Sequence, residues 1–122
     1  MTNNRRRFWW ANLLLGLVSS AGAASLSAAA AAFAVYNETT GTEFVGVYLA
    51  PENTENWGAN QALNDKDHAL DTSERLLLKD IGPRRYDVRL VDRKGRSCIL
   101  KGVDLTRDRS FEVRDQDLTN CH

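Results

Sequence analysis

The sequence has 122 residues, of which 43% are hydrophobic and 26% are charged, a length and composition that fit one small globular domain. Its 16 basic residues balance 16 acidic residues, and this balance excludes the bulk affinity for nucleic acid that a strongly basic protein has. The sequence also has no Ser-His-Asp order and no glycine-rich phosphate loop that would indicate a familiar type of catalysis.

The N-terminal segment has the charge order of an export signal. Residues 4–8 read N-R-R-R-F and precede a short apolar run, and the first acidic residue is Glu38. The motif resembles a twin-arginine signal, and the run is too short for a stable membrane span. We therefore predict a cleaved signal peptide at residues 1–32, a domain without a membrane span at residues 33–122, and a periplasmic or secreted bacterial protein. A general secretory signal and an uncleaved anchor are the alternatives.

Charge is distributed unevenly along the predicted domain. Without the three arginines of the signal, 13 basic residues stand against 16 acidic ones, a net charge of −3. Residues 38–80 hold nine acidic and three basic residues, whereas residues 84–114 hold ten basic and five acidic ones. We expect these halves to neutralise each other within one domain. The alternative is a bipolar surface that docks to a charged partner or to a second copy of the chain.

The first two predicted strands cover residues 33–36 and 44–50. The T-G pair at residues 40–41 indicates a turn, so we expect the two strands to form a hairpin. Apolar side chains on both faces of the second strand indicate a central position in a sheet, and Pro51 ends the strand. Asn37 begins an N-x-T sequence, which we interpret as turn chemistry rather than as a glycosylation site.

A long polar segment follows at residues 51–71. About 20 residues without regular periodicity are unusual in a small domain, and such loops are often functional. Trp57 lies in the middle of this segment. It is either an anchor that folds the loop onto the sheet or an exposed contact residue for a ligand.

The rest of the sequence predicts further short strands. Three leucines at residues 76–78 indicate the next strand, which a glycine-proline pair ends, and a short helix is the alternative. Apolar and polar residues alternate over residues 86–92, and an apolar run at residues 98–103 follows Gly95, which predicts a β-hairpin with this glycine in the left-handed region. Residues 111–114 form a last strand. Six or seven short strands predict an all-β fold, a small antiparallel β-sandwich.

Two cysteines lie in the predicted domain. An exported domain of about 90 residues has a limited core, and such domains are commonly cross-linked. We therefore expect a disulfide between Cys98 and Cys121, which closes a loop of about 23 residues and contributes about 3 kcal/mol through the unfolded state. Two free thiols are the alternative.

Several short motifs resemble those of a family of small exported bacterial proteins. The motifs are an N-x-T-G-like turn, a tyrosine-containing strand that ends near proline, a Trp-Gly pair, a leucine-rich segment, a Y-D-(I/V)-R-x-V-D-x-x-G hairpin and G-V-D-L. They stand here at residues 37–41, 48–51, 57–58, 76–78, 86–95 and 102–105. The first turn has an extra threonine, and the Trp-Gly loop is longer. The resemblance implies a β-sandwich outside the cytoplasm and supplies no catalytic residue.

Basic residues concentrate around the predicted hairpin. They are Arg84, Arg85, Arg89, Arg93, Lys94 and Arg96. We expect these charges to be solvated or paired, for example Asp87 and Arg89 with a cross-strand neighbour such as Glu112. The alternative is an anion-binding face for polysaccharide or phospholipid head groups. The candidate binding residues of the chain are Trp57, Arg85, Arg89 and Arg93.

Three aspartates of the long segment are the candidate metal ligands, and they are Asp65, Asp67 and Asp71. Hard oxygen ligands on a loop suit Ca²⁺, but the segment lacks the central glycine and the terminal glutamate of an EF-hand loop. We therefore expect a solvated acidic loop with His68 exposed in it. A calcium site is the alternative.

The sequence identifies no catalytic group, and we expect no cofactor. The first hypothesis is a non-enzymatic binding or interaction module that contacts an unidentified protein or envelope component through the Trp57 loop. The second is a small hydrolase that uses Ca²⁺ or Zn²⁺ held by the three loop aspartates and His68. The third is an envelope structural protein that associates with itself.

Overall fold

The computed structural model describes residues 32–122, which form seven β-strands and two short 3₁₀ helices and contain no α-helix. The strands are β1 (Phe33–Asn37), β2 (Phe44–Pro51), β3 (Arg75–Leu78), β4 (Arg85–Asp92), β5 (Ser97–Asp104), β6 (Ser110–Val113) and β7 (Asn120–Cys121), and the 3₁₀ helices are η2 (Gln61–Asn64) and η3 (Asp115–Asp117). Apart from Ala32, the predicted signal peptide lies outside the described residues. Within these residues, no helix is long and apolar enough to cross a membrane.

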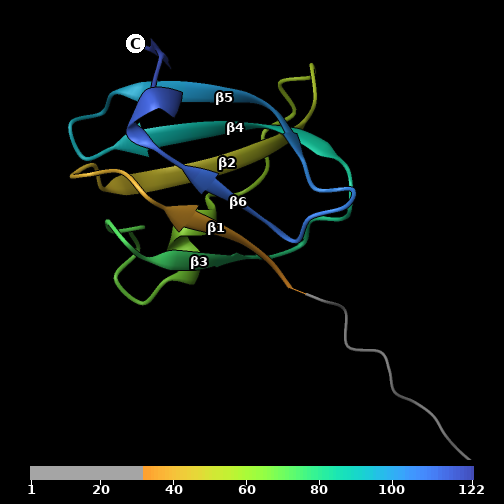
Figure 1. Ribbon diagram of the computed structural model, residues 1–122, viewed down its shortest axis with the longest axis horizontal. Helices are drawn as coiled ribbons and strands as arrows, with labels where there is room; N and C mark the ends of the chain where they lie inside the picture. Colours follow the sequence, from red (N-terminus) through yellow and green to blue (C-terminus); the bar gives the residue numbers. More distant parts are fainter. Residues whose placement is uncertain (1–31) are drawn as a thin grey trace, which may run out of the picture. The chain divides into compact units, whose positions relative to one another are not determined.

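The strands form two sheets that pack against each other as a small β-sandwich (Figure 1). One sheet has the order β3-β1-β6 and the other has the order β2-β4-β5-β7, which confirms the predicted all-β fold. One pair departs from the predicted antiparallel arrangement, because β1 and β6 run parallel. Between β1 and β6 the chain forms β2, β4 and β5, three of the four strands of the larger sheet. A connection this long permits parallel pairing.

The predicted hairpin between β1 and β2 does not form, because the two strands lie in different sheets. Asn37 directs the chain from one sheet to the other. Its buried side chain donates from Nδ2 to the carbonyl oxygens of Thr42 and Leu70, at 2.8 and 3.0 Å. Its Oδ1 accepts from the backbone N–H and the hydroxyl of Thr39, at 3.0 and 2.7 Å. These four hydrogen bonds agree with the interpretation of Asn37 as turn chemistry.

β2 is an edge strand rather than the central strand that its sequence predicted. Part of the long loop covers its free edge. Asn60 Oδ1 accepts from the backbone N–H of Val47 at 3.0 Å, and Asn60 Nδ2 donates to the carbonyl oxygen of Val45 at 2.9 Å. The Gly58 N–H donates to the carbonyl oxygen of Leu49 at 2.9 Å. The loop thus satisfies backbone groups through which an exposed edge recruits other chains.

The hydrophobic core lies between the two sheets. Its largest fully buried apolar side chains are Phe44, Leu70, Leu90, Leu105, Val35, Val47, Val88 and Val113. The leucines of β3 alternate, because Leu76 and Leu78 are buried whereas Leu77 is 45% exposed. This period of two is the one expected of a strand with a single buried face.

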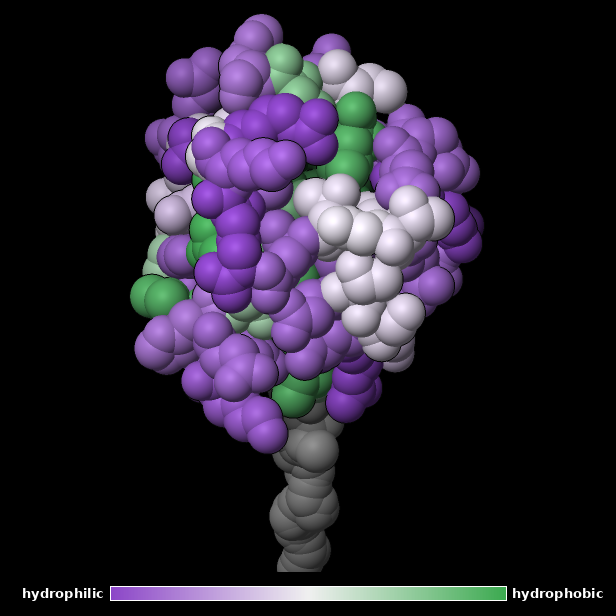
Figure 2. Space-filling view, turned by 90° about the vertical axis from the view of Figure 1, so that its left-hand side faces the viewer, coloured by the Kyte–Doolittle hydropathy of each residue, from purple (hydrophilic) through white to green (hydrophobic). Residues whose placement is uncertain are grey.

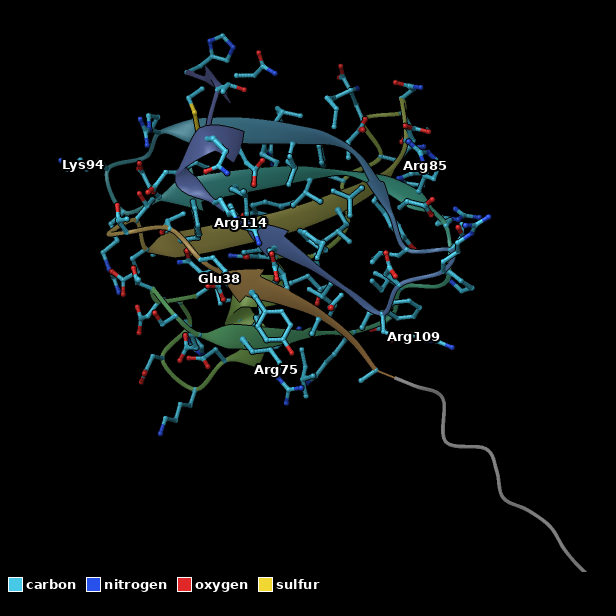
Figure 3. All side chains as sticks on the ribbon, in the orientation of Figure 1. Glu38, Arg75, Arg85, Lys94, Arg109 and Arg114 are labelled. Atoms are coloured by element: carbon cyan, nitrogen blue, oxygen red, sulfur yellow. A yellow bond between two sulfur atoms is a disulfide. The ribbon has the colours of Figure 1, made fainter. Side chains whose placement is uncertain are left out.

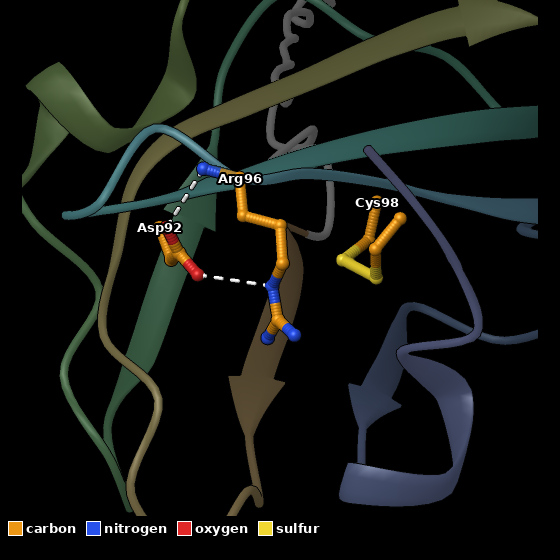
Figure 4. The surroundings of a disulfide bond; sticks show 4 residues. Asp92, Arg96 and Cys98 are labelled. Carbon is orange, nitrogen blue, oxygen red and sulfur yellow. Dashed lines mark hydrogen bonds and ion pairs between the residues drawn. A yellow bond between two sulfur atoms is a disulfide. The ribbon is translucent and has the colours of Figure 1, made fainter.

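The predicted hairpin at residues 86–105 is confirmed as β4 and β5. Gly95 has a φ of 86°, and Asp92 Oδ1 accepts from the backbone N–H groups of Lys94 and Arg96 at 2.9 Å each. The predicted disulfide joins Cys98 to Cys121 and lies close to this turn (Figure 4). It ties β7 to the four-stranded sheet and fits a protein of an oxidising, non-cytoplasmic compartment.

Candidate binding site on the four-stranded sheet

Three side chains form a row on the outer face of the four-stranded sheet. The pairing register sets Tyr48 of β2 opposite Arg89 of β4, and Arg89 opposite Ile99 of β5. Successive residues of a strand point to opposite faces. Because Val88 and Leu90 are buried in the core, Arg89 between them points outward.

Two aromatic rings hold the Arg89 guanidinium. Its Cζ atom lies 4.7 Å from the centre of the Tyr48 ring and 5.1 Å from the centre of a Trp57 ring, within the range of cation–π attraction. Trp57 comes from the long loop, so the fold brings together two of the candidate binding residues, Trp57 and Arg89. We refer to Tyr48, Trp57 and Arg89 as the Arg89 cage.

The donors of Arg89 have no acceptor among residues 32–122. A guanidinium carries five N–H donors, and the Arg89 side chain takes part in no hydrogen bond or ion pair with those residues. Its Nε is the one side-chain nitrogen or oxygen in that range that is buried without a partner. An enclosed donor without an acceptor costs about 1–3 kcal/mol. The expected pairing with Glu112 was wrong, because Glu112 lies in the other sheet and pairs with Arg114.

Arg85 and Arg93, the other two candidate arginines, are paired with acids outside the Arg89 cage. Arg85 Nε lies 3.0 Å from Glu52 Oε1, and Arg93 pairs with Glu43. Arg85 begins β4, whereas Lys94 lies beyond its other end, and Figure 3 shows these two residues at opposite ends of the sheet. The basic residues of the hairpin therefore do not form one continuous patch.

Ion pairs also link the acidic and basic parts of the sequence within the domain. Glu43 and Glu52 belong to the acidic part, and their partners Arg93 and Arg85 belong to the basic part. Figure 2 views the end of the sandwich near Lys94 and shows a mainly hydrophilic face with small, separate hydrophobic areas. These contacts support mutual neutralisation of the two halves.

Asp87 fixes the loop that carries Trp57. Its carboxylate is buried, with 5% of the residue exposed. Asp87 Oδ2 accepts from the Asn53 N–H at 2.9 Å and from Lys101 Nζ at 2.8 Å, and Oδ1 accepts from the Gly102 N–H at 3.2 Å. Burial raises the pKa of Asp87, but these hydrogen bonds outweigh burial and hold the pKa below its usual range. Asp87 is therefore an ionised anchor between the loop and β5.

Gly46 makes room for the Tyr48 ring. A Cβ atom at Gly46 would lie 2.9 Å from Tyr48 Cε2 and 3.0 Å from Val91 Cβ, which is closer than side-chain atoms pack. The ring therefore lies over the glycine backbone and beside Val91, an arrangement that strands commonly use. This packing fixes the side of the cage that Tyr48 provides.

A depression of about 460 Å³ opens beside the cage. It is lined by Asn53, Thr54, Glu55, Trp57, Asp87, Arg89, Ile99 and Lys101. Several of its polar groups already have partners within the protein. Thr54 Oγ1 donates to the carbonyl oxygen of Pro51 at 2.7 Å, and Lys101 Nζ contacts both Asp87 and Asn53 Oδ1. The Arg89 guanidinium is thus the main donor left for a bound group.

A second depression of about 520 Å³ lies between the long loop and the connection from β3 to β4. Its amide side chains hold these two segments together. Gln61 Nε2 donates to the carbonyl oxygen of Lys79 at 2.9 Å, and Gln61 Oε1 accepts from the Lys79 N–H at 2.9 Å and from Asn64 Nδ2 at 2.6 Å. Because these groups serve the fold, this depression is a weaker candidate than the Arg89 cage.

The candidate metal ligands Asp65, Asp67 and Asp71 are not brought together as a site. Within residues 32–122, no group of three or more His, Cys, Asp or Glu side chains is placed where it could hold a metal ion. Asp65 Oδ2 accepts from the Asp67 N–H at 2.8 Å, which is an Asx turn, and His68 is exposed.

Asp71 instead forms a carboxyl pair with Glu43. The pairing follows from the antiparallel bridge between Phe44 and Leu70, because Glu43 precedes Phe44 and Asp71 follows Leu70. The hydrogen bond with Glu43, burial and neighbouring carboxylates raise the pKa of Asp71 to about 6. A hydrogen bond from Arg93 is the main cause that lowers the pKa of Glu43. Below about pH 6, where the pair holds a proton, Asp71 therefore carries it.

Comparison with protein-family models, curated proteins and solved structures finds no match to this chain. The resemblance to a family of exported bacterial proteins therefore stays a prediction. The chemistry of the site rests on its residues alone.

Sequence reasoning missed Tyr48, Asp87 and Gly46 as parts of the site. The alternation of residues 86–92 signals that Asp87 and Arg89 share the outer face. No such signal indicates that Tyr48 lies beside Arg89, because this contact depends on the register between β2 and β4.

Proposed function

We propose that this protein is a non-enzymatic binding module whose contact surface is the Arg89 cage. The observation that carries the proposal is the state of Arg89, which is held between two rings while its N–H donors have no acceptor among residues 32–122. Arg85 and Arg93 on the same hairpin have acid partners, as cations that serve the fold commonly do. Fixed donors beside an aromatic surface and a depression are the features that recognition of a charged group requires.

The bacterial periplasm or exterior is the proposed place of action. The disulfide between Cys98 and Cys121 supports an oxidising compartment. Twin-arginine export is the finer part of the proposal and depends on the N-R-R-R-F sequence at residues 4–8. The partner in that compartment would be a protein or another component of the cell envelope.

The alternative functions have less support from side-chain contacts. A metal-dependent hydrolase would need the loop aspartates as a ligand group, and the described residues hold no such group. Self-association through opposite charges is disfavoured, because Glu52–Arg85 and Glu43–Arg93 pair these charges within one chain.

The test is chemical cross-linking of the full-length protein to its partner in the cell envelope of the native host. We expect Trp57→Ala and Arg89→Ala each to reduce the cross-linked partner about tenfold or more, the effect of losing about 1.4 kcal/mol of binding free energy. Lys94→Ala, which removes an exposed cation at the far end of the sheet, is the matched control and should leave the yield unchanged.

Circular dichroism of each variant checks that the sandwich is still folded. If the folded Trp57→Ala and Arg89→Ala proteins keep the wild-type yield of cross-linked partner, the cage is not the contact surface and the proposal is wrong.

A further inference from the structure

We propose that the Arg89 cage binds a single carboxylate group that is attached to an apolar moiety. The last residue of a polypeptide with an apolar side chain and a free apolar carboxylic acid both have this chemistry. The inference rests on the proposed function and names the ligand class of the same site.

The first step concerns the sign of the ligand's charge. The Arg89 guanidinium has no anionic partner among residues 32–122, whereas Lys101, the other cation of the depression, is paired with Asp87 at 2.8 Å. An anion would therefore supply the acceptors that the guanidinium lacks. The rings of Tyr48 and Trp57 already hold the guanidinium, so binding would cost little of the side-chain freedom that a mobile arginine loses.

The second step concerns the size of the charge. Two carboxylates, Asp87 and Glu55, line the same depression as Arg89. Asp87 is neutralised by Lys101, so Arg89 compensates one negative charge of a ligand, whereas a second charge on a phosphate or sulfate would face Glu55 without a compensating cation. A planar carboxylate also matches the paired N–H groups of a guanidinium. The local charges therefore favour a monoanion.

The third step concerns the part of the ligand that flanks the carboxylate. A sugar acid would need partners for its hydroxyl groups, but Thr54 and Lys101 are already engaged with other groups of the protein. The apolar side chains of the lining are Ile99 and Trp57, and both are partly exposed. These surfaces favour an apolar flank over a polyol.

The test is a fluorescence titration of the full-length chain with Trp9→Phe and Trp10→Phe, in which Trp57 is the one tryptophan left of three. The probes are N-acetyl-leucine, N-acetyl-leucinamide, galacturonate and inorganic phosphate. The amide keeps the shape of the first probe and removes its charge. Galacturonate keeps the charge on a polyol, and phosphate doubles it.

We expect N-acetyl-leucine to change the Trp57 emission with a Kd on the order of 1 mM. The other three probes should bind with a Kd at least about tenfold higher. Arg89→Ala in the same background should abolish the response, whereas Lys94→Ala should preserve it. A leucine-terminated tripeptide with a free carboxylate then separates the two sources. Tighter binding than N-acetyl-leucine indicates a polypeptide terminus, and equal binding indicates a free acid.

Equal binding of the amide, tighter binding of galacturonate or phosphate, or no response to any probe would overturn the proposal. If the cross-linking yield in the cell envelope still depends on Trp57 and Arg89 in that case, the ligand class is wrong and the proposed function stands. If the yield depends on neither residue, the proposed function fails as well.

Discussion

Asn37 is the single residue on which the crossing between the two sheets most depends. It is buried and makes four side-chain hydrogen bonds, two of them to carbonyl oxygens of Thr42 and Leu70. We expect Asn37→Ala to lower the free energy of unfolding by about 2–4 kcal/mol, because it leaves enclosed polar groups without partners. Urea denaturation measures the loss, and the exposed Thr40→Ala serves as the control. A loss below about 0.5 kcal/mol would show that the crossing does not need this amide.

Asp71 gives the stability a pH dependence of its own. The pKa of Asp71 in the folded protein is about 6, above its ordinary value of 3.8, so folding favours the protonated carboxyl. The stabilisation from this group is complete below about pH 4 and is lost as the pH rises through about 6. We expect Asp71→Asn to match the wild-type thermal midpoint at pH 4 and to exceed it at pH 7. Asp108→Asn, at an exposed position, is the control. The assignment would be refuted if the thermal midpoints of Asp71→Asn and wild type differed by the same amount at both pH values.

At the scale of elements, the cover over the β2 edge is the feature with the clearest consequence. Asn60 replaces a neighbouring strand by bonding to the backbone of Val47 and Val45. We expect Asn60→Ala to lower the free energy of unfolding by about 1–3 kcal/mol and to produce association that rises with concentration. Sedimentation velocity checks the association, with Asn56→Ala of the same loop as the control. An Asn60→Ala protein that stays monomeric at high concentration would show that the edge is protected in another way.

The strands were predictable from the sequence, but their assignment to sheets was not. The alternation in β4 and the apolar runs in β3 and β5 are local properties, so the positions of these strands followed from neighbouring residues alone. The turn after β1 also looked local, yet it depends on the bond from Asn37 to Leu70, 33 positions away. No short-range pattern reports such a contact, and the T-G pair therefore suggested a hairpin that does not form.

The candidate site was predictable to the same extent. The outward position of Arg89 follows from its place between Val88 and Leu90, and a lone tryptophan in a long loop is a reasonable contact residue. The contact between Arg89 and Trp57 was not predictable, because it requires the hydrogen bond from the Asn53 N–H to Asp87, 34 positions away. The alternative of a metal site at the loop aspartates was based on composition alone. In the fold, Asp65 forms a turn and Asp71 forms a carboxyl pair.

For the whole molecule, the disulfide joins the C-terminal residues to the sheet that carries the cage. Cys98 and Cys121 are 23 positions apart, so breaking the bond releases a loop of that length in the unfolded chain. We expect the double variant Cys98→Ser and Cys121→Ser to lose about 3 kcal/mol of unfolding free energy. Reduction of the wild-type protein should cause a loss of similar size, measured by urea denaturation with and without reductant. Equal stability of the oxidised and reduced proteins would contradict this estimate.

The central claim is that Arg89 is held for binding rather than for the stability of the sandwich, and one variant tests it without knowledge of the ligand. Arg89→Met keeps an unbranched side chain that packs against the two rings and removes the donors that have no acceptor. We predict that the free energy of unfolding of this variant equals that of the wild type or exceeds it by up to about 1 kcal/mol. A loss of more than about 2 kcal/mol would mean that Arg89 serves the fold, and it would contradict the claim.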